Sequence, residues 1–102
     1  MLQLKKGVIL TGVRSEILFI IYQIQKYFEE HLPKKDFVIT SLTDGKHMKG
    51  SLHYKGLALD MRSRDFYMKE AGDFFHWFVS NYDKEYDLVV EKDHFHIEYD
   101  PK

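Results

Sequence analysis

The chain has 102 residues, of which 44% are apolar and 16% aromatic, and its net charge is −1 with neutral histidines. These values predict one globular domain over residues 1–102 with a modest core, and they exclude a disordered chain. The absence of cysteine excludes disulfides, thiolate metal ligands and cysteine nucleophiles.

The distribution of charged and apolar residues bears on partners and location. No cluster of basic residues is present, so we expect no nucleic-acid partner. No apolar run reaches the ~18 residues of a membrane span, so we expect no membrane insertion. Lys5 and Lys6 precede a short apolar stretch, but Arg14 and Glu16 interrupt it and no small-residue cleavage site follows. We expect synthesis in the cytoplasm without a signal peptide, and a monomer.

The first half of the chain predicts a helix between short extended segments. Residues 1–13 are expected to form a short strand or arm that ends in a turn at Thr11-Gly12. From Ser15 to His31 apolar residues recur at helical spacing, which predicts a core helix that stops at Leu32-Pro33. Residues 37–40 are β-branched and short, typical of a strand. The glycines that follow predict a loop over residues 42–50.

The second half predicts a strand, a helix and a hairpin. Residues 57–61 alternate, so Asp60 should lie on the face opposite the large apolar side chains. Asp65 is a candidate cap for a helix that runs to about Tyr82. The apolar stripe expected along it consists of Met68, Ala71, Phe75, Phe78 and Tyr82. Residues 87–91 and 94–98 predict an antiparallel hairpin.

The last strand divides its side chains in the same way as the Asp60 strand. One face carries Phe95, Ile97 and Tyr99, and the other carries His94, His96 and Glu98. This agreement predicts an α+β fold with a small antiparallel sheet, helices packed on one face and a metal site on the other.

The candidate metal ligands begin with His53 and Asp60. An imidazole and a carboxylate suit a borderline-soft divalent cation. Between them, Gly56 can adopt a backbone conformation that a sharp turn into the strand needs, and Ala58 leaves room on the Asp60 face. A third ligand is expected from the stretch Glu91-Lys-Asp-His-Phe-His96.

Each part of this pattern also has an ordinary interpretation. Two histidines on one strand face are more often solvated than metal-bound, and a lone His53 would usually be a loop residue. His31 and His76 fall on helices and are expected to be surface or core residues. The combination of His, Gly, Ala and Asp at fixed spacing with a paired-histidine strand nevertheless favours a metal site.

The combined motif resembles that of the zinc peptidases that include D-Ala-D-Ala carboxypeptidases, the dipeptidase of vancomycin resistance and several bacteriophage endolysins. It is also similar to the zinc-bearing signalling domain of hedgehog proteins, which shares that fold. In these proteins an H-x-x-G-x-A-x-D motif is followed by a helix, a strand that ends in Glu, and an H-x-H strand. The resemblance covers residues 37–99.

The resemblance implies zinc held by His53, Asp60 and a histidine of the last strand, with water in the fourth position. Such zinc lowers the pKa of its bound water to ~7 and polarises the scissile carbonyl. Glu91 is then the candidate general base. In one register His96 is the third ligand and His94 stabilises the oxyanion. In the Glu-x-x-His register, His94 is the ligand. We favour His96, because the hedgehog-like order matches this stretch most closely.

The chain departs from the family in the loop before the motif. Many members carry an arginine there that holds substrate or transition-state charge, but residues 40–47 contain none. Lys46 or His47 could replace it, or the stretch is an ordinary solvated loop. Arg62 could orient the ligand carboxylate or bind a substrate carboxylate, and Ser51 could hydrogen-bond to a ligand. Ser51, Arg62 and His47 are therefore the candidate substrate-binding residues, with a structural role as the alternative.

The resemblance implies a zinc metallopeptidase, a carboxypeptidase or endolysin-type endopeptidase, that cleaves peptide bonds in peptidoglycan stems. A phage-type protein of this kind would reach the cell wall through a membrane pore or in a virion. The alternative is a non-catalytic, zinc-stabilised binding module of the hedgehog-like fold. A purely structural phage component would leave the ligand pattern unexplained.

Overall fold

The fold is described from a computed structural model, which defines residues 1–44 and 52–102. Its elements, in chain order, are β1 (Leu2–Leu4), α1 (Ser15–His31), β2 (Phe37–Ser41), β3 (Ala58–Arg62), α2 (Met68–Tyr82), β4 (Tyr86–Val90) and β5 (His94–Tyr99). The predicted α+β class is confirmed. The bounds of α1 agree with the prediction, and those of the last four strands differ from it by one residue at one or both ends.

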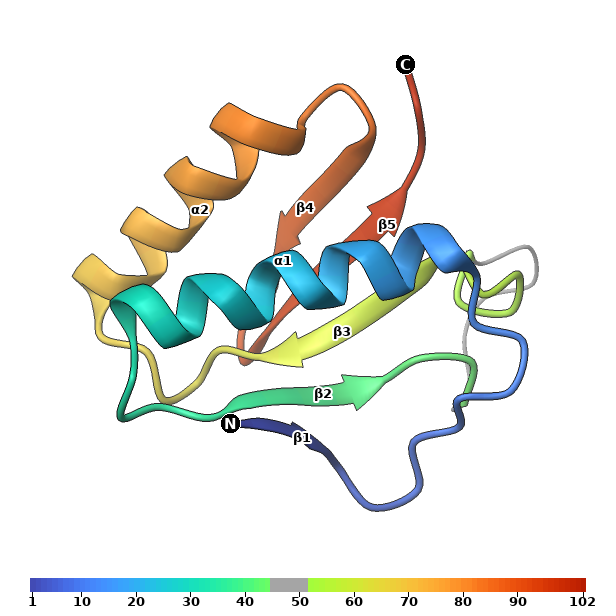
Figure 1. Cartoon of the computed structure of the whole chain (residues 1–102), viewed down its shortest axis with the longest axis horizontal. Coiled ribbons are helices and arrows are strands. Elements are labelled where there is room, and N and C mark those ends of the chain that lie inside the picture. The colour runs from blue at the N-terminus through green and yellow to red at the C-terminus, as the bar shows by residue number, and fades with distance from the viewer. Residues whose placement is uncertain (45–51) are drawn as a thin grey trace.

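The strands form one five-stranded sheet in the order β1-β2-β3-β5-β4 (Figure 1). The pairs β2–β3, β3–β5 and β4–β5 are antiparallel, whereas β1 runs parallel to β2. The sheet is therefore mixed, and the prediction of a purely antiparallel sheet was wrong at this edge. The reason is the connection, because the chain passes through α1 between β1 and β2, and such a crossover joins parallel strands.

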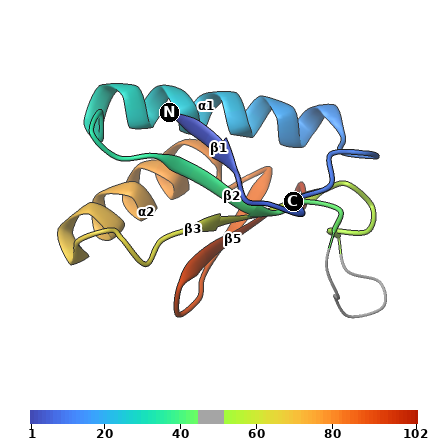
Figure 2. The same ribbon diagram turned by 90° about the horizontal axis from the view of Figure 1, so that it is seen from below.

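Both helices cover the same face of the sheet, as Figure 2 shows from below. The core between them contains Ile17, Ile20 and Ile24 from α1, Phe74 and Phe78 from α2, and Leu59, Met61, Phe95 and Ile97 from the two central strands. The ring of Phe74 stacks on that of Phe95, with centroids 5.3 Å apart. The residues of β3 and β5 that alternate with these core residues consequently lie on the opposite face of the sheet, which no helix covers.

The second helix differs from its prediction at its start and in its buried stripe. It begins at Met68, where the Tyr67 amide donates to the Glu70 carboxylate at 2.8 Å, and Asp65 does not cap it. Met68 is 92% exposed and Phe75 is 39% exposed, so neither belongs to the core. The buried phenylalanines are Phe74 and Phe78. Because Phe74 and Phe75 are adjacent, the sequence did not show which of them faces the core. The contact of Phe74 with Phe95 of β5 decides it.

In the described parts of the chain, no helix combines the length and apolar character that crossing a bilayer requires.

Candidate metal centre

The two central strands bring one carboxylate and one imidazole together. Asp60 lies opposite His96 in the antiparallel register of β3 and β5. Their sequence neighbours Leu59, Met61 and Phe95 are buried in the core, so alternation directs Asp60 and His96 to the face without helices. Directly opposed residues have Cβ atoms about 4.5–5.5 Å apart, which is close enough for two polar side chains to meet.

His53 reaches the same point from the turn before β3. In this turn Gly56 has φ +74°, a conformation that L side chains rarely adopt. A Cβ at this position would lie 1.9 Å from the Gly12 carbonyl oxygen, and the Gly56 carbonyl accepts a hydrogen bond from the Arg14 amide at 2.9 Å. The turn predicted at Gly56 is thus confirmed and docks tightly against the loop before α1. His53 is held with only 2% of its surface exposed.

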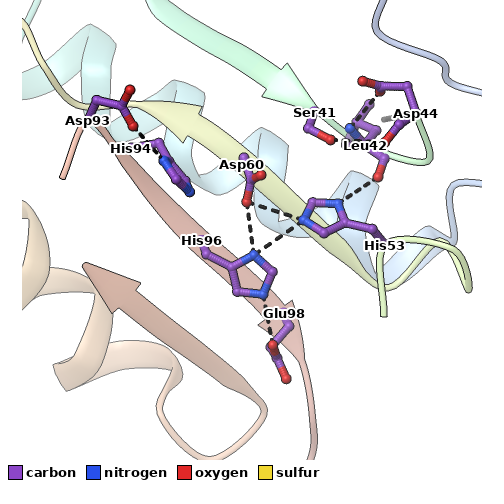
Figure 3. A network of polar contacts seen from close by, with 9 residues as sticks. All are labelled: Ser41, Leu42, Asp44, His53, Asp60, Asp93, His94, His96 and Glu98. Atoms are coloured by element: carbon purple, nitrogen blue, oxygen red, sulfur yellow. Dashed lines mark hydrogen bonds and ion pairs between the residues drawn. The ribbon is translucent and has the colours of Figure 1, made fainter. Parts of the chain in front are cut away.

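Three ligand atoms converge at this site (Figure 3). Nε2 of His53 lies 3.2 Å from Oδ1 of Asp60 and 3.3 Å from Nδ1 of His96. Nδ1 of His96 lies 2.9 Å from the same Oδ1. The atoms therefore form a small triangle, of which His96 and not His94 supplies the third corner. We call this set the His53–Asp60–His96 group.

The outer nitrogen of each imidazole has a fixed partner. Nδ1 of His53 donates to the Leu42 carbonyl oxygen at 2.6 Å, and Nε2 of His96 donates to the Glu98 carboxylate at 2.8 Å. A neutral imidazole has only one N–H, so in its neutral form each ring directs a lone pair toward Asp60, whereas a protonated ring donates a hydrogen bond to it. Three lone-pair atoms that face one another repel unless a proton or a metal cation lies between them. The arrangement is therefore one that a cation would stabilise.

The spacing of the three atoms fits a metal ion. Tetrahedral zinc with N and O ligands at about 2.0–2.1 Å places neighbouring ligand atoms about 3.3–3.4 Å apart. The measured separations of 2.9–3.3 Å are close to that value. Two imidazoles with one carboxylate favour zinc or a similar transition metal over Mg²⁺ and Ca²⁺. The partners of the outer nitrogens are also typical of metal-bound histidines, which usually donate to a carboxylate or a carbonyl.

The ionisation of the group agrees with this chemistry. Burial opposes the charge on Asp60, but hydrogen bonds from His53 and His96 outweigh it and hold the Asp60 pKa well below its usual range. The hydrogen bond to Asp60 raises the pKa of His96, partial burial works against this rise, and Glu98 supports it. An anionic carboxylate is thus maintained at neutral pH, and the proton on His96 is the competitor that a metal must displace.

The remaining predicted catalytic residues, His94 and Glu91, come from the hairpin of β4 and β5. His94 is on the same face of β5, and its Nδ1 donates to the Asp93 carboxylate at 2.8 Å. This hydrogen bond also lowers the pKa of Asp93. Glu91 directly follows β4, and its amide donates to the His94 carbonyl at 2.9 Å. Val89 lies opposite His96, so alternation places position 91 on the same face of the sheet as His94 and His96. The Glu91 side chain is exposed.

A groove of about 330 Å³ adjoins the His53–Asp60–His96 group. Asp60, Arg62 and His94 line it together with Lys5, Val38, Thr40, Ser41, Arg64 and Asp93. Arg62 therefore does share the Asp60 face, and its Nη2 donates to Asp65 at 3.3 Å. The predicted candidates Lys46, His47 and Ser51 lie outside the described residues.

Three residues with a role at the site were not predicted as such: Glu98, which was expected on the ligand face without a role, and Leu42 and Asp44 in the segment after β2. The role of Glu98 could have been predicted from its position two residues after His96 on one strand, where its carboxylate can contact the ring. Asp44 accepts hydrogen bonds from the amides of Leu42 and Ile9 at 2.9 and 3.0 Å, and so fixes the segment whose carbonyl orients His53. A contact through a backbone carbonyl leaves no mark in the sequence.

No protein-family model, curated protein or solved structure matches this chain.

Proposed function

We propose that the chain is a zinc-dependent peptidase that cleaves peptide bonds in the stem peptides of peptidoglycan. The observation that carries the proposal is the convergence of His53, Asp60 and His96, with the outer nitrogen of each ring fixed by a second partner. The peptidoglycan substrate rests on the resemblance of the combined motif to zinc carboxypeptidases and endolysins. The site of action is then the cell wall, reached after phage-mediated release or as part of a virion.

In this proposal the three ligands hold zinc, and zinc supplies a Lewis acid and a water of lowered pKa. Glu98 and the Leu42 carbonyl orient the two imidazoles. Glu91 accepts the proton of the attacking water and delivers it to the leaving amine. Its position beside the histidine strand and its exposure to solvent support this role.

His94 stabilises the carbonyl oxygen as negative charge develops on it. The Asp93 carboxylate holds Nδ1–H of His94, which leaves Nε2 as the atom available to the substrate. A protonated ring can then donate from Nε2, and the adjoining groove lined by His94 and Asp60 offers space for a peptide.

The test is hydrolysis of purified peptidoglycan, with the released fragments identified by mass spectrometry. Zinc-loaded wild-type protein should release peptides or amino acids, and chelator should abolish the release. Glu91→Gln should keep zinc and fold yet lose ~10²–10⁴-fold in turnover. Lys92→Gln serves as the matched control, because it removes a neighbouring exposed charge without removing the proposed base. Undiminished cleavage by Glu91→Gln would rule out the assigned role.

The second candidate is a zinc-stabilised binding module without turnover. It is favoured by one observation, that the three ligands link the turn before β3 to two strands, as a structural metal site does. This candidate predicts stable zinc and no cleavage of any stem peptide by the wild-type protein.

A further inference from the structure

We propose that the outer edge of β4 binds an extended segment of a partner protein as an added antiparallel strand, and that this segment carries the pattern basic–apolar–apolar–apolar–basic. In strand addition, main-chain hydrogen bonds supply affinity and alternate side chains supply specificity. The site lies on the outer side of β4, whereas the ligand strands β3 and β5 lie on its inner side. The inference therefore does not depend on the proposed peptidase function.

The main chain of β4 has unpaired hydrogen-bonding groups along its outer side. Among the described strands, β4 is the last in the sheet and pairs only with β5 (Figure 1). The Glu91 amide donates to the His94 carbonyl, and the Asp100 amide donates to the Glu85 carbonyl. Because the pattern alternates, the odd-numbered residues of β4 direct their main-chain groups toward β5 and the even-numbered ones direct theirs outward. The outward-directed residues are Tyr86, Leu88 and Val90.

This edge lacks the features that usually prevent strand addition. Natural edge strands are protected by lysine, proline, a bulge or very short length. The segment Tyr86–Val90 contains neither lysine nor proline, and its register against β5 is continuous over all 5 residues. Val89 is 43% exposed and Val90 is 58% exposed. A groove of about 460 Å³ adjoins the strand and is lined by Leu88 and Val89 together with Val79 of α2. The edge is thus open to another strand.

The side chains of β4 define what an added segment must carry. On the face without helices, Asp87, Val89 and Glu91 follow one another at alternate positions. A segment added on the outer side meets these positions as non-hydrogen-bonded pairs, in which opposed side chains approach most closely. Basic residues opposite Asp87 and Glu91 form ion pairs, and an apolar residue covers Val89. On the helix side, Leu88 and Val90 favour apolar residues.

One basic side chain already lies at this edge. Nζ of Lys102 lies 2.6 Å from Oδ1 of Asp87, and 57% of the Lys102 side chain is exposed. An exposed ion pair of this kind is weak, so a basic residue of the partner can share Asp87 with Lys102 or replace it. The position opposite Asp87 therefore accommodates a cation.

The same charges disfavour a second copy of this chain as the occupant. Antiparallel pairing of two β4 strands about Val89 places Asp87 of each copy opposite Glu91 of the other. Pairing about Leu88 places Glu85 of each copy opposite Glu91 of the other. Like charges directly opposite each other destabilise a strand pair. The complement of this acidic edge is consequently a basic segment and not the edge itself.

The test is fluorescence anisotropy with a short labelled peptide whose centre is Lys-Val-Val-Val-Lys, for which we expect saturable binding. N-methylation of the first and third valines, whose amides face β4 in the added strand, should weaken binding at least ~10-fold. N-methylation of the two lysines is the matched control, because their amides face away, and should change affinity less than about threefold. The corresponding peptide with Glu in place of both lysines should bind at least ~10-fold more weakly.

Variants of the protein test the same edge from the other side. Val90→Lys should weaken binding of the lysine peptide at least ~10-fold, because an edge lysine opposes both its charge and its apolar side chains. Val90→Thr is the matched control and should retain binding, with the fold of both variants checked by circular dichroism.

Equal effects of the two N-methylated peptides, or no measurable binding of the lysine peptide, would overturn strand addition. Equally tight binding of the glutamate peptide would overturn the basic partner. Sedimentation that shows a wild-type dimer lost in Val90→Lys would identify a second copy as the occupant and overturn the partner assignment. These measurements require neither zinc nor cleavage, so a failure of the peptidase proposal shows separately in the peptidoglycan assay.

Discussion

Replacement of Glu98 by Gln should weaken metal binding without removing a ligand. Glu98 accepts a hydrogen bond from Nε2 of His96 at 2.8 Å, and both side chains are largely shielded from solvent, with 25% and 21% exposed. The carboxylate thereby fixes the ring and makes its other nitrogen a better ligand. Gln can still accept the hydrogen bond but carries no charge. We expect a 10–100-fold loss of zinc affinity, which corresponds to about 1.4–2.7 kcal/mol.

The assay is competition for zinc against a chromophoric chelator at fixed pH and salt, with the fold checked by circular dichroism. The matched control is Asp87→Asn, because Asp87 lies directly opposite Glu98 on β4 and pairs with Lys102 rather than with His96. It removes one nearby negative charge but no contact to the metal group, so we expect less than about a threefold change. Equal losses in the two variants would refute the reasoning, since only the general negative field would then matter.

Four further predictions concern the same region. His96→Ala should lose zinc whereas His94→Ala should retain it, as measured by elemental analysis, and the reverse would establish the Glu-x-x-His register. Chelation should lower the melting temperature by removing RT ln(1 + [L]/Kd) of stabilisation, so an unchanged melting curve after verified metal removal would contradict it. Because Asp60 raises the pKa of His96, the metal-free protein should lose folding stability as pH rises above about 6.5. The zinc-loaded protein should instead release zinc, and so lose stability, as pH falls. Calorimetry of both forms across pH distinguishes these opposite dependences of stability on pH. Gly56→Ala should destabilise the fold by about 2–5 kcal/mol in urea unfolding, from its positive φ and the clash with Gly12, and a change below about 1 kcal/mol would show that the turn can relax.

The hydrophobic pattern was sufficient to predict α1 and the division of β3 and β5 into two faces. The apolar residues of α1 repeat at 3.6-residue spacing over 17 residues, and Pro33 follows its end. In β5 the alternation of Phe95 and Ile97 with the histidines fixed which side chains would lie away from the core. Local backbone geometry determines both signals, so they can be read from the sequence alone.

Tertiary structure decided the features that depend on pairing between distant segments. The phase of α2 and the parallel edge of β1 are of this kind, because each depends on a neighbour that periodicity does not specify. The same holds for the third corner of the His53–Asp60–His96 group. The alternation places His94 and His96 on one face without distinguishing them, and only the resemblance favoured His96. The register between β3 and β5 separates them by placing His96 opposite Asp60 and His94 opposite Arg62. The sequence supplied the candidate ligands, and the strand register selected the ones that meet.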